Sequence, residues 1–453
     1  MTIEQRIEAL PPSLRGQVLR ADDAEYDAAR HIWNGMIDRR PDVIVRAAGA
    51  ADVVAVVNFA REQNLPLAIR GGGHSAAGSS VSQGGVMLDL SLMKGIRVDP
   101  ARGTARAEAG MTWAEFDAET QAFGLATTGG VVSSTGIAGL TLGGGIGWLG
   151  RTYGLSADNL LSADIVTADG QLRTLSAEEN ADLFWAIRGG GGNFGVVTSF
   201  EYQLHPVGPM VFAGLLVWPR PMAREVLRGY REFTQGVPEY ASAYAGLGTL
   251  PDGTPVVIVI GFHNGQTEEG EALFAPLRRL GPPVADMMQS MPYTAAQQML
   301  DALNPPGNRV YWKSQILRNI DDDVLDTIID QGASMPSPLT AALIEFYGGA
   351  INRVATLDTA YPLRDATYAL NAISAWTDAS RDAENIAWAR GTWETVQRYS
   401  PGSVYVNFLG VGDESDDRVR AAYGENYSRL ATIKAQYDPT NLFRLNHNIK
   451  PVT

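Results

Sequence analysis

The stretch Arg70-Gly71-Gly72-Gly73-His74-Ser75 decides how this chain is interpreted, because it places three consecutive glycines directly after a predicted strand. Glycine loses more conformational freedom on folding than other residues, so such a run needs an offsetting gain. The usual gain is a ligand that approaches the bare backbone, since successive N–H groups in a glycine turn form a concavity that binds anions. Arg70 adds positive charge at the turn. These residues therefore predict a site for a pyrophosphate.

Two more glycine-dense segments follow this turn, at residues 129 to 150 and 188 to 195. One such segment alone is as well explained by a tight turn, but three in one half of the chain favour a large cofactor. Each of the two later segments contains a match to G-x-G-x-x-G. Neither match lies between a clear strand and a helix, so neither predicts a Rossmann site. By contrast, residues 41 to 70 predict a strand, a helix and a second strand leading into the first turn.

The chain has 453 residues, of which 45% are hydrophobic and 19% charged, with 49 glycines and 24 prolines. This composition predicts a globular protein of two or three domains and excludes a coiled coil. The formal net charge of −14 argues against nucleic acid as a partner. Cysteine is absent, which excludes disulfides and thiolate metal sites. Neither a signal peptide nor a run of 18 apolar residues is found, so we expect a cytoplasmic protein without a membrane partner.

The local composition of the sequence changes after His205-Pro206, because the glycine clusters end there. We predict segments at residues 1 to 205, 206 to 403 and 404 to 453. The middle segment contains a hairpin signal, Pro251-Asp252-Gly253, followed by amphipathic helical patterns, and is predicted to be a separate α+β unit. The last segment predicts a helix from Tyr423 to Gln436.

Several motifs occur together and in order, and they carry a resemblance that covers nearly the whole chain. They are Arg70 to His74, Gly129 to Gly145, Tyr153 to Asn159, Phe184 to Gly191, Tyr405 to Asn407 and Tyr437 to Arg444. With them, the chain resembles the berberine-bridge-enzyme-like branch of the vanillyl-alcohol oxidase and para-cresol methylhydroxylase flavoproteins. The resemblance implies an α+β fold with a two-subdomain FAD-binding (PCMH-type) domain, to which residues 404 to 453 return, and an α+β substrate-binding domain with an antiparallel sheet.

The resemblance also implies FAD, with its pyrophosphate on the Arg70 to Ser75 loop and its ring tethered through the 8α-methyl to His74. A neutral imidazole is nucleophilic near pH 7, which suits this role. Many relatives add a second tether from a cysteine at the position of Val132, so attachment through His74 alone is expected here. The residues expected to contact the cofactor are Arg70, Gly71, Gly72, Gly73, His74, Ser75, Gly129, Gly130, Thr135, Gly136, Gly139, Gly143, Asp158, Asn159, Val197, Asn446 and Asn448.

The catalytic base is not identified, because the tyrosines and the strand glutamate used by relatives are replaced here by Ala76, Phe408 and Ala369. Tyr405 and Tyr347 are the remaining catalytic candidates. A phenol near pKa 10 needs a cationic neighbour to act as a base at neutral pH. Asn371 and His263 are weaker candidates, because polar groups on predicted strands usually face solvent. Thr135 takes the position that controls oxygen access in relatives.

Three functions remain open. The first is an oxidase that takes two electrons from the alcohol or amine group of a small molecule and passes them to oxygen, forming hydrogen peroxide. The second is a dehydrogenase with another acceptor. The third is a non-redox cyclase or ligand-binding protein in which FAD is structural. The substrate and the oligomeric state are not predicted.

Overall fold

In the computed structural model, which describes residues 3 to 413 and 415 to 452, the glycine turn leaves the end of a small mixed sheet. The expected strand, helix and strand are present as β2 (Val43–Arg46), α3 (Ala50–Glu62) and β3 (Leu67–Arg70). Strand β4 (Val86–Asp89) lies between β2 and β3 and runs parallel to both, while β1 (Gln17–Leu19) adds an antiparallel edge. Because β3 ends at Arg70, residues 71 to 75 begin where the sheet stops.

A second, antiparallel sheet shares a hydrophobic core with the first and completes the glycine-rich half of the molecule. Its strands, in spatial order, are β5 (Ile96–Asp99), β6 (Thr104–Glu108), β10 (Val196–Gln203), β8 (Leu160–Val166) and β9 (Leu172–Ser176). The helices of this half are α1 (Ile3–Ile7), α2 (Tyr26–Arg30), α4 (Trp113–Gln121), α5 (Ile137–Leu142), α6 (Gly150–Tyr153) and α7 (Ala181–Ile187). The short strands β7 (Leu125–Ala126) and β11 (His205–Pro206) pair with each other.

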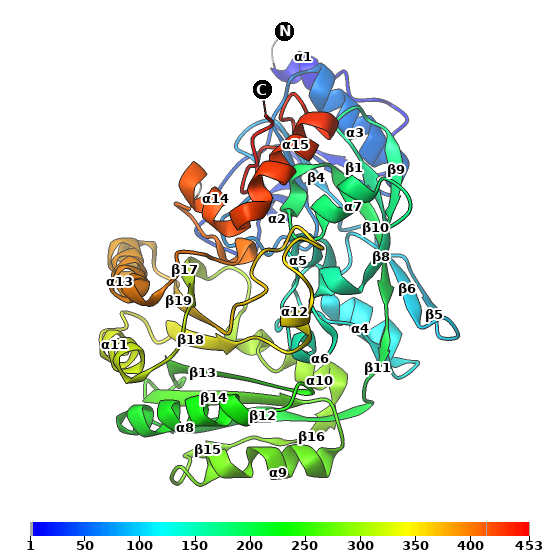
Figure 1. The fold of residues 1–453 in the computed structure, drawn as a ribbon. Helices are drawn as coiled ribbons and strands as arrows, with labels where there is room; N and C mark the ends of the chain where they lie inside the picture. The colour runs from blue at the N-terminus through cyan, green and yellow to red at the C-terminus, as the bar shows by residue number, and fades with distance from the viewer. Residues whose placement is uncertain (1–2, 414, 453) are drawn as a thin grey trace.

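An eight-stranded antiparallel sheet forms the other half, in the lower part of Figure 1. Its main path runs through β15 (Ala285–Asp286), β12 (Met210–Pro219), β14 (Pro255–His263), β13 (Ala241–Thr249), β18 (Ala341–Phe346), β19 (Tyr368–Trp376) and β17 (Arg309–Leu317), and β16 (Gln289–Pro292) pairs with β12. The predicted hairpin at Pro251-Asp252-Gly253 is confirmed, since it joins β13 to β14. The structure thus confirms the α+β fold with an antiparallel sheet.

Helices cover one face of this sheet and leave the other face for the cavity. The covering helices are α8 (Ala223–Gly236), α9 (Thr267–Arg278), α11 (Asp322–Gly332) and α13 (Asp382–Val396). Side chains alternate along a strand, so Val257 and Val259 pack under the helices while Ile258 and Ile260 line the cavity. Helix α10 (Tyr293–Gln298) packs against α4, and α12 (Ala350–Arg353) packs against α6.

The C-terminal segment returns to the glycine-rich half, and both ends of the chain lie at the same end of the molecule (Figure 1). Helix α14 (Asp416–Tyr423) is separated from α15 (Tyr427–Tyr437) by a turn in which Gly424 has a φ of +52°, so the helix predicted from Tyr423 starts later. In the completely buried pair Lys434–Asp438, the ammonium also donates to the backbone oxygen of Asn193 at 2.7 Å. This lysine fastens the tail to the third glycine segment.

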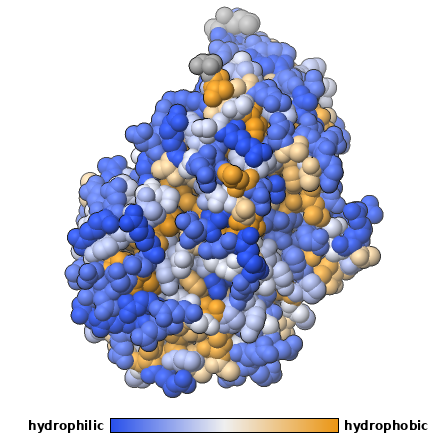
Figure 2. All heavy atoms as spheres, in the orientation of Figure 1, coloured by the Kyte–Doolittle hydropathy of each residue, from blue (hydrophilic) through white to orange (hydrophobic). Residues whose placement is uncertain are grey.

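The outer surface of the molecule is mostly hydrophilic on the face shown in Figure 2, with smaller hydrophobic patches between. Among the helices of residues 3 to 413 and 415 to 452, none combines the length and the apolar character needed to cross a bilayer.

Candidate active site

A cavity of about 790 Å³ lies between the glycine-rich half and the uncovered face of the eight-stranded sheet. One wall consists of residues 71 to 76, parts of 130 to 146, parts of 191 to 197 and the tail residues 445 to 447. The opposite wall comes from strands β12, β13, β14, β17, β18 and β19. We call these the glycine wall and the sheet wall.

The glycines of the glycine wall present backbone to the cavity. A Cβ on Gly72 would lie 2.4 Å from the backbone nitrogen of Gly136, so the first and second glycine segments touch only because both lack side chains. Gly139 and Gly192 have no neighbouring atom within 4 Å of a Cβ position, and both line the cavity. A larger residue at either position would therefore occupy the cavity itself.

Most of the residues predicted to contact the cofactor lie on this wall. They are Gly71, Gly72, Gly73, His74, Ser75, Gly130, Thr135, Gly136, Gly139, Val197 and Asn446. Val132, at the position of the second tether in relatives, also lines the cavity.

The other predicted cofactor residues lie outside the cavity lining, for reasons of local packing. The Arg70 guanidinium turns back to donate to the backbone oxygen of Ala29 and lies next to Gly73, outside the lining itself. A Cβ on Gly129 would meet the indole of Trp113 at 2.8 Å, and one on Gly143 would meet the Asn407 amide at 2.1 Å. Both glycines serve close packing instead.

Asp158 and Asn159 are also engaged elsewhere, and Asn448 is not part of the lining. Asp158 forms a buried two-contact ion pair with Arg364, at 2.7 and 2.8 Å. The amide of Asn159 donates to the backbone oxygen of Leu155 at 2.8 Å. The motif that contains Asp158 and Asn159 therefore stabilises the fold next to the second glycine segment.

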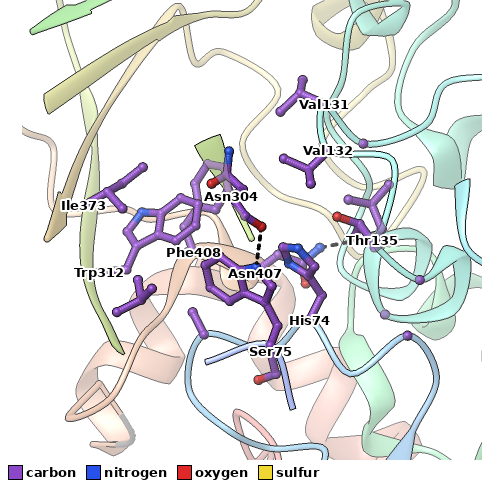
Figure 3. A pocket seen from close by; sticks show the side chains of 18 of the residues that line it. His74, Ser75, Val131, Val132, Thr135, Asn304, Trp312, Ile373, Asn407 and Phe408 are labelled. Atoms are coloured by element: carbon purple, nitrogen blue, oxygen red, sulfur yellow. Dashed lines mark hydrogen bonds between the residues drawn. The ribbon is translucent and has the colours of Figure 1, made fainter. Parts of the chain in front are cut away.

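His74 is half-buried at the cavity, where its ring stacks on the indole of Trp33 with centroids 4.5 Å apart and planes inclined by 18°. Burial lowers the pKa of His74 to about 4. The imidazole is therefore neutral at neutral pH, and its Nε2 has no hydrogen-bond partner. In Figure 3, His74 lies between Thr135 on one side and Trp312 and Phe408 on the other.

Tyr405 lines the cavity from the position just before a 3-10 turn (Val406–Phe408). Its hydroxyl oxygen accepts hydrogen bonds from the backbone N–H of Gly145 at 2.9 Å and the Asn407 amide at 2.7 Å. Burial raises the pKa of Tyr405 above its usual value of 10, and no cationic side chain opposes that effect. The cationic neighbour required for a tyrosine base is therefore not provided, and Tyr405 is a neutral phenol.

Tyr347 lies outside the cavity lining, and its hydroxyl donates to the Glu345 carboxyl at 2.7 Å. Burial raises the pKa of Tyr347 well above 10. Glu345 is itself buried but lines the cavity, and burial raises the pKa of its carboxyl to about 7. A carboxyl that titrates near neutral pH is suited to accept a proton from a substrate.

Glu345 is not among the site residues predicted from the sequence, which indicated only that the strand glutamate of relatives is replaced by Ala369. In the sheet, Glu345 on β18 is paired directly with Ala369 on β19, the position where relatives were expected to carry the glutamate. A carboxyl is therefore present beside this position, on the neighbouring strand. The pattern Ala341, Leu343, Glu345 places all three residues on the cavity face, which is the signal available in the sequence.

Asn371 and His263 are both completely buried, contrary to the expectation that they face solvent. Asn371 accepts a hydrogen bond from the indole of Trp312 at 2.9 Å. His263 lies edge-on to the ring of Tyr240, and neither Asn371 nor His263 is part of the cavity lining.

The comparisons with known proteins agree with the motifs. The family model of the FAD binding domain matches residues 41–176, and the model named berberine and berberine like matches residues 404–450. An FAD-linked oxidoreductase of Dictyostelium discoideum is 32% identical over 446 residues, which cover 97% of this chain and 96% of that protein. The chain belongs to the berberine-like FAD-linked oxidoreductases.

A further curated relative and a solved structure match this chain over nearly its whole length. (R)-6-hydroxynicotine oxidase of Paenarthrobacter nicotinovorans is 32% identical over 457 residues, with 98% of each chain covered. The crystal structure of 6-hydroxy-D-nicotine oxidase from Arthrobacter nicotinovorans is 31% identical with a TM-score of 0.88, and the match covers 98% of this chain and 100% of that one. The resemblance inferred from the sequence is confirmed.

The residues of this structure fit FAD. Gly139 and Gly192 leave free space along the glycine wall. The Nε2 of His74 and the side-chain oxygen of Asn446 are buried without a hydrogen-bond partner, although buried polar atoms normally have one. The glycine wall therefore has both the room and the unused polar atoms that a bound dinucleotide would require.

Proposed function

We propose that this protein is an FAD-dependent oxidase that removes two electrons from the carbon bearing an alcohol or amine group and passes them to oxygen, forming hydrogen peroxide. The observation behind this proposal is the buried carboxyl of Glu345. It lies on the sheet wall, across the cavity from the glycine wall where the cofactor would bind. The full-length similarity to (R)-6-hydroxynicotine oxidase supports oxygen as the acceptor. Oxygen and a small molecule are thus the proposed partners.

Residues 71 to 75, Gly139, Gly192 and Asn446 would hold the cofactor. Bound FAD supplies the acceptor for a hydride and the route by which the electrons reach oxygen. We propose that it is attached through His74, whose imidazole is neutral and has an unpaired ring nitrogen. The residue at the position of the second tether is Val132, and the chain has no cysteine, so the attachment is single.

Glu345 acts as the base. In its carboxylate form it accepts the proton that the substrate heteroatom gives up while the neighbouring carbon loses a hydride. The hydroxyl of Tyr347 donates to this carboxyl and fixes its orientation. The raised pKa, about 7, leaves the carboxyl ionised at weakly alkaline pH.

Tyr405 acts as a hydrogen-bond donor rather than as a base. Its oxygen already accepts two hydrogen bonds, from Gly145 and Asn407. The phenol O–H is therefore the group that Tyr405 offers to the cavity, where it can orient the heteroatom of the substrate.

Anaerobic mixing of the purified holoprotein with candidate alcohols and amines tests the proposed function. We expect the yellow flavin to bleach with a substrate and to regain its colour rapidly, with release of hydrogen peroxide, when air is admitted. Colour that returns only with an artificial acceptor would identify a dehydrogenase. A flavin that no alcohol or amine bleaches would favour the non-redox function.

A further inference from the structure

We infer that the substrate is a hydrophobic amine, which places its ammonium group against Glu345 and its apolar body against the sheet wall. This inference rests on the proposed oxidase function and narrows its substrate class. It follows from the composition of the sheet wall and of the cavity mouth.

The sheet wall is apolar because the strands present alternate residues to the cavity. Ile258 and Ile260 on β14, Leu343 on β18, Val310 on β17 and Ile373 on β19 all line it. These side chains offer contact area and no hydrogen bonds. Figure 3 shows Ile373 beside Trp312 on the side of the cavity opposite Thr135. A substrate body that replaces water here gains free energy in proportion to its apolar area.

Two polar side chains on and around this wall are already bound within the protein. The indole N–H of Trp312 donates to Asn371 at 2.9 Å. The amide of Asn304 donates to the backbone oxygen of Leu300 at 2.9 Å. These two groups are therefore not available to a polyol, which must exchange many hydrogen bonds with water for bonds with protein.

Glu345 differs from the other residues of this wall because its side chain is an acid. Among the cavity-lining residues of the described chain, it is the only carboxylic acid, and lysine, arginine and aspartate do not occur. A lone carboxylate in an apolar cavity is best satisfied by a ligand that carries one positive charge. The neighbouring hydroxyl of Tyr347 fills one of its acceptor sites and leaves others for the ligand.

The mouth of the cavity has the same character as the sheet wall. Leu303 and Leu339 line the cavity although 64% and 46% of their surfaces, respectively, are exposed. Exposed leucines at a cavity mouth favour the entry of an apolar ligand over that of a strongly hydrated ligand. The net charge of −14 also attracts cations toward the protein.

The atoms balance for an amine. The ammonium gives one proton to the Glu345 carboxylate and becomes a neutral amine. Loss of a hydride from the adjacent carbon then leaves a C=N bond with one positive charge. The hydride, with its two electrons, and the proton held by Glu345 reach oxygen as hydrogen peroxide, so one amine and one oxygen give one iminium ion and one peroxide.

A binding experiment with the holoenzyme tests the inference. The probes are 2-phenylpropan-2-amine and its alcohol, 2-phenylpropan-2-ol, which have the same shape and no hydrogen on the reacting carbon. At pH 8, where Glu345 is ionised, we expect the amine to perturb the flavin spectrum at about 10- to 100-fold lower concentration than the alcohol. In Glu345→Gln this preference should disappear, while Glu271→Gln on the surface of α9 should keep it.

Equal binding of amine and alcohol to the parent enzyme, or an unchanged preference in Glu345→Gln, would overturn the inference. The measured quantity is the ratio of the concentrations at which the amine and the alcohol perturb the flavin spectrum. Because this ratio is taken within each variant, a general loss of binding through an altered fold does not produce the same result. The companion assay is peroxide release from 1-phenylethylamine, 1-phenylethanol and glucose. We expect the amine to be oxidised best; oxidation of glucose or the alcohol in its place would reject the amine while leaving the oxidase function intact.

Discussion

The two walls of the cavity recognise ligands in opposite ways. The glycine wall offers backbone and empty space at Gly139 and Gly192, whereas the sheet wall offers packed aliphatic side chains and one acid, Glu345. The glycine wall comes mainly from loops and short helices, and the sheet wall from six strands. A wall rich in glycine backbone suits a cofactor that remains bound to the protein. A wall made of side chains suits a substrate, because side chains can change between relatives while the fold is kept.

Filling the glycine wall should have the largest effect. We expect Gly139→Leu to abolish retention of FAD, because a side chain there would occupy the cavity. The matched control is Gly391→Leu on α13, where a Cβ likewise has no neighbour within 4 Å but lies outside the cavity lining. The measurement is the ratio of flavin absorbance to protein after purification. Full flavin content in Gly139→Leu would show that the cofactor does not use this wall.

Removing the acid of the sheet wall should lower the rate but not the flavin content. We expect Glu345→Gln to slow anaerobic flavin reduction by about 10²- to 10⁴-fold, the usual contribution of a general base. Stopped-flow absorbance with the best substrate measures this rate. A parent-like rate in Glu345→Gln would transfer the role of base to another group and remove the contrast between the two walls.

The indole behind His74 should control how completely the flavin is attached. We expect Trp33→Ala to lower the covalent fraction severalfold, because the stacked indole holds the imidazole in one orientation. Trp33→Phe, which keeps an aromatic face, should stay close to the parent. Acid precipitation followed by absorbance of the pellet and the supernatant gives this fraction, and an unaltered fraction in Trp33→Ala would assign the indole to packing alone.

The smallest effect is expected where α4 meets α10. Burial raises the pKa of Asp117 from 3.8 to about 7, and Gln297 donates to its carboxyl at 2.9 Å. The folded protein thus keeps a proton that the unfolded chain loses, so the stability due to this group falls as pH rises from about 4 to about 7. Asp117→Asn should therefore raise the unfolding temperature by a few degrees at pH 8 and by less at pH 5.

The control for this prediction is Glu119→Gln, an exposed position on the same helix. Thermal unfolding at both pH values should show no pH-dependent gain for it. A gain in Asp117→Asn that is larger at pH 5 than at pH 8 would contradict the direction of the pKa shift.

The difference between the walls also explains what the sequence could predict. The strand, helix and strand before the turn, the hairpin at residues 251 to 253 and the α+β fold followed from local patterns, because turns and alternation are properties of neighbouring residues. The glycine segments likewise show themselves in short stretches of sequence. Most residues predicted from them lie on the cavity.

The features of the site that the sequence does not predict depend on contacts between residues far apart in the chain. The register of β18 and β19 places Glu345 beside position 369, and a single sequence does not reveal this register. Asp158 carries a conspicuous motif, yet its partner Arg364 is about 200 residues away and turns it into a structural ion pair. Burial, which sets the protonation of Tyr405 and Glu345, is a property of the assembled cavity.

The attachment of the flavin tests the account most directly. Protein denatured in acid should keep its yellow colour in the pellet, and protease digestion should place the mass of FAD on the single peptide that contains His74. In His74→Ala the colour should move to the supernatant. Flavin released from the parent protein, or found on a peptide without His74, would contradict the account.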